Sequence, residues 1–186
     1  MSLHTDIDRG EVLLPIARAA IARRFGLWFD IAEDVDFLNQ PGACFVTLVL
    51  SGRLRGCIGS LEARRALVDD VKANALAAAF QDPRFAPLSS SEFNLTQIEI
   101  SLLSPLLPIE ICNEEQAAAQ LRPEVDGAVL EFNERRGTFL PQVWESLREP
   151  RVFLNELKRK AGLPADFWSD EVRLYRYQVE KWAERQ

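Results

Sequence analysis

The sequence predicts an α+β fold, in which antiparallel sheets are covered by helices and two lobes enclose a cleft. Two observations predict it. Apolar, β-prone segments follow one another through short turns, and helical segments separate them without regular βαβ alternation. At 186 residues the chain can bury one large core or two small ones. We expect a single domain over 1–186, with a larger lobe of about 1–41 and 105–186 and a smaller lobe of about 42–104.

The first predicted helix covers residues 8–25. Asp8 and Glu11 have the spacing of a capping box, and Gly26 is suited to end the helix. Pro15 either kinks this helix or marks the start of its regular part.

A hairpin is predicted next. Residues 43–50 are almost all apolar and β-prone, Ser51-Gly52 is a two-residue turn, and residues 53–59 form the returning strand. This turn predicts that residue 50 lies opposite residue 53, residue 48 opposite 55, residue 46 opposite 57 and residue 44 opposite 59.

Alternation along the two strands then predicts a core face and a mixed face. The core face carries Phe45, Val49, Leu54 and Ile58. The mixed face carries Val46, Leu48 and Leu50 together with Arg53, Arg55 and Cys57. A shift of one residue in the pairing would exchange the two faces.

The remaining elements alternate between helix and strand. A helix is expected at 66–80, a capped turn at Ser89-x-x-Glu92, and a half-buried strand at 96–103. Further on we expect strands at 109–112, 128–132, 138–140 and 172–179, helices from Asn113 to 121 and from 150 to 162, and a frayed tail from 180.

Composition excludes several classes of protein. The net charge of -6 and pI of about 5.0 argue against a nucleic-acid binder. No apolar stretch reaches the length that spans a bilayer, and the beginning of the sequence does not resemble a signal peptide, so we expect a cytoplasmic protein without a membrane span. Three cysteines without a C-x-x-C pair indicate neither a disulfide framework nor a zinc ribbon. His4 is the single histidine, which removes most histidine-dependent mechanisms.

The densest cluster of chemistry-bearing residues lies between Arg53 and Glu62. Cys57 is a candidate nucleophile because nearby cations lower the pKa of a thiol, and Glu62 is a candidate acid or base. The alternative is that Cys57 packs as a small apolar residue.

Arg55, with Gly56 and Gly59, forms a candidate anion site, since arginine binds carboxylate or phosphate with two hydrogen bonds and glycine permits close approach. The alternative is an arginine paired with Glu62 or Glu99 and glycines that serve a bulge or tight packing. No phosphate-binding loop or other cofactor motif is recognised, and the spacing of Cys57, Glu62 and Glu99 is a weak signal for a metal site.

The segment Leu54-Arg55-Gly56-Cys57-Ile58-Gly59 resembles the six-residue signature of the AMMECR family, whose bacterial and archaeal members are called component A of the AmmeMemoRadiSam system. The resemblance extends over Cys44 to Leu48, Asp82 to Phe85, Ile98 to Ser101, Asp126-Gly127, Leu140 to Val143, Phe153-Leu154, Lys160 to Leu163 and Trp168. Ala63 departs from the family, in which a proline is expected after the glutamate.

The resemblance implies a two-lobed α+β fold with a cleft. It implies two partners, a Memo-type protein and a radical S-adenosylmethionine protein, and it implies no particular activity or cofactor. It adds candidate site residues without roles, namely Asp82, Arg84, Glu99, Asp126 and Gln142. On their own, Asp82 and Arg84 also fit a helix stop followed by an ion-paired turn, Glu99 fits the wet face of a strand, and Asp126 fits a turn.

Two functions remain open. The protein is expected to be a ligand- or partner-binding component that works through residues 54–59, because no catalytic group or cofactor motif is recognised. The alternative is an enzyme that acts on a small anionic or nucleotide-like substrate, with Cys57 as the reactive thiol and Arg55 as the anion binder.

Overall fold

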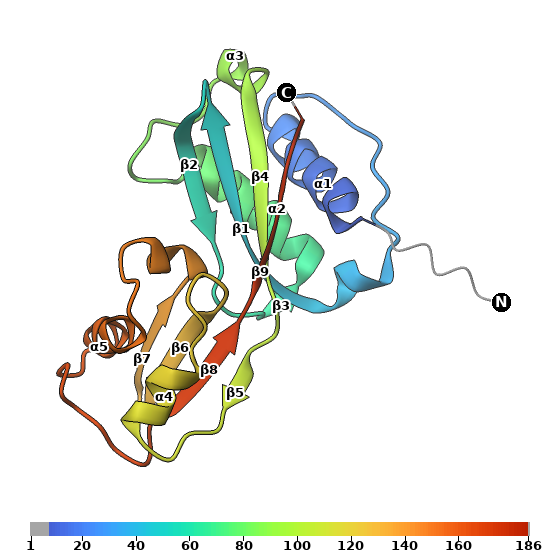
Figure 1. The fold of residues 1–186 in the computed structure, drawn as a ribbon. Helices are drawn as coiled ribbons and strands as arrows, with labels where there is room; N and C mark the ends of the chain where they lie inside the picture. Colours follow the sequence, from blue (N-terminus) through green and yellow to red (C-terminus); the bar gives the residue numbers. More distant parts are fainter. Residues whose placement is uncertain (1–7, 186) are drawn as a thin grey trace. The chain divides into compact units, whose positions relative to one another are not determined.

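The computed structural model describes residues 8–185, and the chain forms two compact units. The first unit contains the described residues up to Leu103 together with those from Glu180 onward, and the second unit is Ser104–Val179. Each unit combines an antiparallel sheet with helices (Figure 1). The predicted α+β class with antiparallel sheets is therefore confirmed.

The first unit is built on a sheet with the strand order β2-β1-β4-β9, and β3 pairs with the start of β1. Its elements in chain order are α1 (Arg9–Arg23), a 3₁₀ helix (Asp36–Asn39), β1 (Pro41–Leu50), β2 (Arg53–Gly59), β3 (Arg65–Ala66), α2 (Leu67–Phe80), α3 (Ser90–Phe93), β4 (Thr96–Leu103) and β9 (Val179–Ala183).

Helices α1 and α2 lie on the same face of this sheet (Figure 1). Their apolar stripes pack with the inward side chains of the strands into one core. The fully buried members include Leu13 and Ile16 of α1, Val71 and Ala75 of α2, Val46 and Leu48 of β1, and Ile98 and Ile100 of β4. We call the opposite side of the sheet, which faces away from α2, the open face.

The second unit is a sheet with the order β5-β8-β6-β7, and all of its strand pairs are antiparallel. Its elements are β5 (Leu107–Ile109), α4 (Glu114–Gln120), β6 (Gly127–Phe132), β7 (Arg135–Phe139), a 3₁₀ helix (Pro141–Glu145), α5 (Pro150–Lys160) and β8 (Arg173–Tyr177). Phe153, Leu154 and Leu157 of α5 are fully buried in the core of this unit. No helix among residues 8–185 has the length and apolar character needed to cross a membrane.

Several local predictions are confirmed. Helix α1 begins after Asp8, whose carboxylate accepts the Gly10 N–H at 2.9 Å, and continues through Pro15. Ser89 and Glu92 form both hydrogen bonds of a capping box at α3. Asn113 caps α4 by accepting the Gln116 N–H at 2.9 Å.

The grouping of the segments differs from the expected lobes. The sequence assigned α1 to the lobe that contains the later strands, whereas α1 packs on α2 in the first core. The segment expected to be a frayed tail instead forms β9, and its Trp182 fills the space beside Gly10 of α1. Trp182, together with the ion pair between Glu184 and Arg18 of α1, thus anchors a segment whose polar sequence gave no strand signal. The cleft between two lobes stays a prediction.

The β1–β2 hairpin has the predicted turn. Ser51 and Gly52 have positive φ angles of 51° and 74°, as a two-residue hairpin turn with matching twist requires. Leu50 lies opposite Arg53, as expected.

The predicted pairing is wrong from Leu48 onward because β2 contains a β-bulge. Val49 lies opposite Leu54 and Leu48 lies opposite Gly56, so that Arg55 has no partner residue. The extra residue shifts the rest of the hairpin by one position, which places Thr47 opposite Cys57 and Phe45 opposite Gly59.

The assignment of faces is consequently wrong for β1 and for Leu54, whereas Ile58 packs against the core as expected. Val46 and Leu48, expected on the mixed face with Cys57, are fully buried under the helices. Leu54, expected in the core, is 45% exposed. Val46 and Leu48 pack against the alanine-rich surface of α2, where side chains of this size fit between helix and sheet.

Gly56 provides a test of this packing. A Cβ atom at Gly56 would lie 2.2 Å from the backbone carbonyl oxygen of Ala78 in α2, and a backbone atom cannot move aside as a flexible side chain can. Gly56→Ala is expected to lower the free energy of unfolding by about 2–3 kcal/mol, measured by urea denaturation.

The matched control for this substitution is Arg53→Ala, at an exposed position at the start of the same strand. Its free energy of unfolding is expected to stay within about 0.5 kcal/mol of the parent value. Equal effects of the two substitutions would contradict the close approach of α2 to β2.

Candidate functional site

A row of three polar side chains crosses the open face of the first sheet. Thr47 of β1 lies opposite Cys57 of β2 on one side and opposite Glu99 of β4 on the other. Directly paired residues point to the same face of a sheet, so the three side chains lie together. All three are half-buried, and the Thr47 hydroxyl donates a hydrogen bond to the Cys57 sulfur at 3.2 Å.

Apolar side chains flank this row on both sides. Phe45 lies opposite Gly59 in one neighbouring row, and Val49 lies opposite Leu54 in the other. A Cβ atom at Gly59 would lie 2.2 Å from the Phe45 ring, so the glycine leaves the space that the ring occupies. Gly59 thus serves packing, one of the two alternatives that the sequence left open.

Asp82 and Arg84 hold the backbone of Cys57 at the edge of the sheet. β2 is an edge strand, and the Asp82 carboxylate accepts the Cys57 N–H at 2.9 Å while Arg84 Nη2 donates to the Cys57 carbonyl at 3.3 Å. Arg84 also donates to the Asp82 carboxylate through Nε and Nη2, at 3.0 and 2.7 Å. We call this pair the edge clamp.

The hydrogen bonds within the edge clamp favour the charged forms of both Asp82 and Arg84. The hydrogen bond from Arg84 holds the pKa of the Asp82 carboxyl well below its usual range, and the Cys57 and Arg84 N–H groups act in the same direction against the effect of burial. The same hydrogen bond raises the pKa of Arg84. The structural interpretation of this segment, a helix stop followed by an ion-paired turn, is therefore correct. In addition, the Asp82–Arg84 pair binds the backbone of Cys57.

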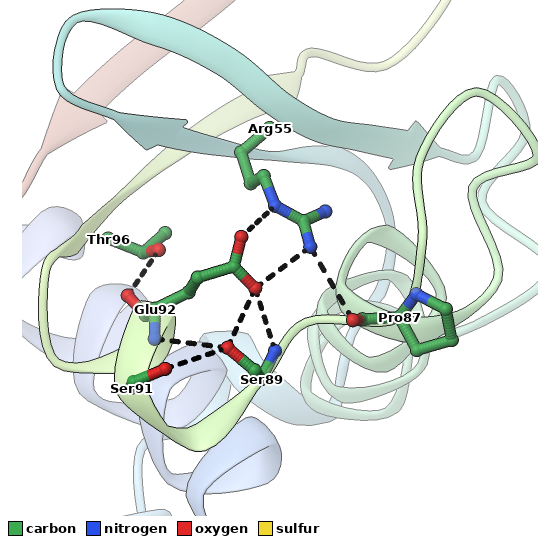
Figure 2. A network of polar contacts seen from close by, with 6 residues as sticks. All are labelled: Arg55, Pro87, Ser89, Ser91, Glu92 and Thr96. Atoms are coloured by element: carbon green, nitrogen blue, oxygen red, sulfur yellow. Dashed lines mark hydrogen bonds and ion pairs between the residues drawn. The ribbon is translucent and has the colours of Figure 1, made fainter.

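Arg55, the bulged residue, is ion-paired with Glu92 of α3 (Figure 2). Its Nε and Nη2 groups donate to the two carboxylate oxygens at 2.9 and 3.1 Å. The expected partners Glu62 and Glu99 were therefore wrong, although the expectation of an arginine paired with an acid was correct. Only 12% of the Arg55 side chain is exposed.

The Glu92 carboxylate accepts two further hydrogen bonds besides those from Arg55 (Figure 2). It accepts the Ser89 N–H and the Ser89 hydroxyl, both at 2.9 Å, as part of the capping box. The Arg55 hydrogen bond and these donors lower the pKa of Glu92 to about 2. Arg55 and Glu92 thus join β2 to α3 through Nε and Nη2 of the guanidinium, whereas its buried Nη1 has no hydrogen-bond partner among the described residues.

Glu62 lies in a different place, a pocket of about 490 Å³ just beyond β2. The pocket is lined by Ser60, Leu61, Glu62, Arg64, Arg65 and Asp70. The Glu62 carboxylate accepts a hydrogen bond from Arg64 Nε at 2.6 Å.

The other predicted site residues are not part of these groups. Arg53 is exposed at the hairpin end of β2. Asp126 and Gln142 belong to the second unit. Asp126 is fully buried, pairs with Arg122 at 2.6 Å and accepts the Trp144 indole N–H on its carbonyl at 2.7 Å, whereas Gln142 is exposed in the 3₁₀ helix after β7.

No group of three or more His, Cys, Asp or Glu side chains is placed to hold a metal ion within residues 8–185. His4 lies outside the described residues.

Comparison with known proteins decides the family. A family model described as AMMECR1 matches residues 14–182. The chain belongs to the AMMECR1 family. It is 37% identical over 182 residues to a protein of Methanothermobacter thermautotrophicus, with 93% of each chain covered, and 35% identical over 163 residues to a protein of Thermotoga maritima, with 86% and 88% covered. The crystal structure of an uncharacterized protein from Pyrococcus horikoshii matches with a TM-score of 0.76 and 31% identity, over 94% of this chain and 91% of that one.

Sequence reasoning missed several residues that shape the site of this AMMECR1-family chain. Thr47 carried no motif, because its role depends on its position between two paired strands. Glu92 was recognised as a capping residue but not as the partner of Arg55. Asp70 and Asn74 are buried on the inner stripe of α2, and polar residues at such positions are a usable signal for a buried hydrogen-bond network.

The edge clamp can be tested through amide exchange at Cys57. Asp82→Ala removes the acceptor of this N–H at an otherwise open strand edge. Exchange of the Cys57 amide, followed by NMR, is expected to become about tenfold faster or more, as the loss of a hydrogen bond to a charged group implies.

The internal control is the amide of Ile58, which lies opposite Val46. Its exchange is expected to change much less than that of Cys57. If both amides accelerate equally, the substitution has destabilised the whole unit and the clamp is not the local cause.

The Arg55–Glu92 pair predicts a defined pH dependence. The pKa of Glu92 is lowered to about 2 in the folded chain by the Arg55 hydrogen bond and is ~4.3 in the unfolded chain. Its contribution to stability is therefore present above about pH 4.3 and is lost as the pH falls toward 2. Glu92→Gln is expected to lower the free energy of unfolding at pH 7 by about 1–2 kcal/mol, since the carboxylate is partly exposed.

This difference between parent and variant, measured by urea denaturation, is expected to shrink steadily between about pH 4.3 and 2. Glu134→Gln, at an exposed turn position, is the control and should show no such dependence. A parent–variant difference that is constant over this range would contradict the pairing.

Proposed function

We propose that this AMMECR1-family protein is a non-catalytic binding component whose open face, around Cys57, Thr47 and Glu99, docks a partner protein. The partners proposed are a Memo-type protein and a radical S-adenosylmethionine protein. The observation that carries the proposal is the cross-strand row itself, which presents a thiol, a hydroxyl and a carboxylate away from the helix-covered core.

The surroundings of the row support docking of a protein surface. Phe45, Val49 and Leu54 flank the polar row, and Leu54 is 45% exposed. Apolar side chains around a few hydrogen-bonding groups are typical of the core of a protein–protein interface.

Three other residues of the segment 54–59 make contacts that stabilise the first unit. Arg55 is bound to Glu92, Gly56 accommodates the Ala78 carbonyl, and Gly59 accommodates Phe45. Leu54 and Cys57 are the members of this segment that remain turned to the open face, and they therefore give the segment its recognition surface.

The alternative enzyme, with Cys57 as the thiol and Arg55 as the anion binder, has less support. It needs both groups at one substrate, whereas Arg55 points to α3 and Cys57 points to Thr47. The Thr47 hydroxyl is the hydrogen-bond partner of the sulfur, and a hydroxyl does not act as the general base that activates a thiol.

The proposal is tested by binding of the purified full chain to the Memo-type and radical S-adenosylmethionine proteins of the same organism, each tested separately. Glu99→Lys reverses a charge in the row, and Leu54→Asp places a charge in its apolar border. Each substitution is expected to weaken binding at least about tenfold, as changes at the centre of an interface do.

Glu134→Lys, which makes the same charge change at an exposed turn of the second unit, is the control and should bind as the parent does. Absence of binding by the parent chain to both proteins would refute the proposed partners. Binding that is equal in parent, Glu99→Lys and Leu54→Asp would refute the open face as the docking surface.

A further inference from the structure

The pocket beyond β2 has the size and lining of a small-molecule site. Its volume of about 490 Å³ lies within the range of known ligand pockets. It is formed by the segment between β2 and β3 and by the first turns of α2, and four of its six lining side chains are charged. The hydrogen bonds among these side chains determine what kind of ligand the pocket suits.

Asp70, which is 1% exposed, forms the floor of the pocket and is saturated with donors. One oxygen accepts from the Ser60 hydroxyl at 2.6 Å and from Arg65 Nε at 2.8 Å. The other accepts from the Cys44 N–H and from Asn74 Nδ2, both at 2.9 Å. A carboxylate has about four acceptor positions, and all four are used. Asp70 therefore offers nothing to a bound cation and instead fixes Ser60 and Arg65.

The two arginines keep donors that these contacts do not use. Arg65 donates its Nε hydrogen bond to Asp70, and no acceptor in the described part of the chain reaches its two Nη groups. Arg64 binds Glu62 through Nε and Nη2, which leaves its Nη1 group. The Arg65 and Arg64 side chains are 44% and 81% exposed, so a ligand can reach both.

The resulting pocket is rich in donors and poor in available acceptors. Each of its carboxylates is matched by an arginine, and each arginine retains N–H groups in the planar arrangement that binds two oxygens at once. We infer that this pocket is a binding site for an oxyanion group, a phosphate or a carboxylate of a small molecule, held by Arg65 and Arg64. The site is separate from the proposed docking of a protein on the open face and does not rest on it.

The inference is tested by calorimetric titration of the full chain with inorganic phosphate and, separately, with succinate, at constant ionic strength set with chloride. Saturable binding of at least one of the two anions is expected. Binding of phosphate alone or of succinate alone supports the site and identifies the class of anion.

Arg64→Ala and Arg65→Gln are each expected to weaken this binding about tenfold, as the loss of charge-assisted hydrogen bonds implies. Arg151→Ala, at an exposed arginine that does not line the pocket, is the matched control and should bind as the parent does. Thermal melting without anion verifies that each variant is folded. If Arg65→Gln fails to fold, the exposed Arg64 decides the question.

Two results would overturn the inference. One is that neither phosphate nor succinate binds the parent chain. The other is that both anions bind the folded arginine variants as tightly as the parent, which would place any anion binding elsewhere.

Discussion

Helix α2 lies so close to β2 that the Ala78 carbonyl occupies the space where a side chain at Gly56 would be. The polar contacts around the hairpin depend on this distance. Asp70 and Asn74, on the inner stripe of the helix, reach the backbone of Cys44 at one end of β1. Asp82, two residues beyond the helix, reaches the backbone of Cys57. The helix and the turn that follows it therefore fix the main chain of β1 at Cys44 and of β2 at Cys57.

The amount that could be predicted from the sequence follows from the range of the interactions involved. The hairpin turn and the capping box depend on neighbouring residues, and both were predictable. The bulge at Arg55 was not, because an ion pair with Glu92, 37 positions away in the chain, holds the extra residue. That one residue reversed the neighbours predicted for Cys57, replacing the apolar Val46 and Leu48 by Thr47.

The contrast between local and long-range interactions also explains why the candidate residues belong to several separate groups. A list of charged side chains within ten positions suggested one site. In the structure, Arg55 serves α3, Glu62 and Arg64 line a pocket, and Cys57 lies in the cross-strand row. Alternation along a strand separates adjacent residues more strongly than sequence distance suggests, since neighbours point to opposite faces.

The edge clamp also restricts how a partner can bind near Cys57. An exposed edge strand normally invites another strand to pair with its free N–H and C=O groups. At Cys57 both groups are already taken, the N–H by Asp82 and the carbonyl by Arg84. A partner therefore cannot extend the sheet across this position without displacing an ion pair. The proposed docking on the open face would therefore rely on the thiol, hydroxyl and carboxylate of the row rather than on backbone pairing.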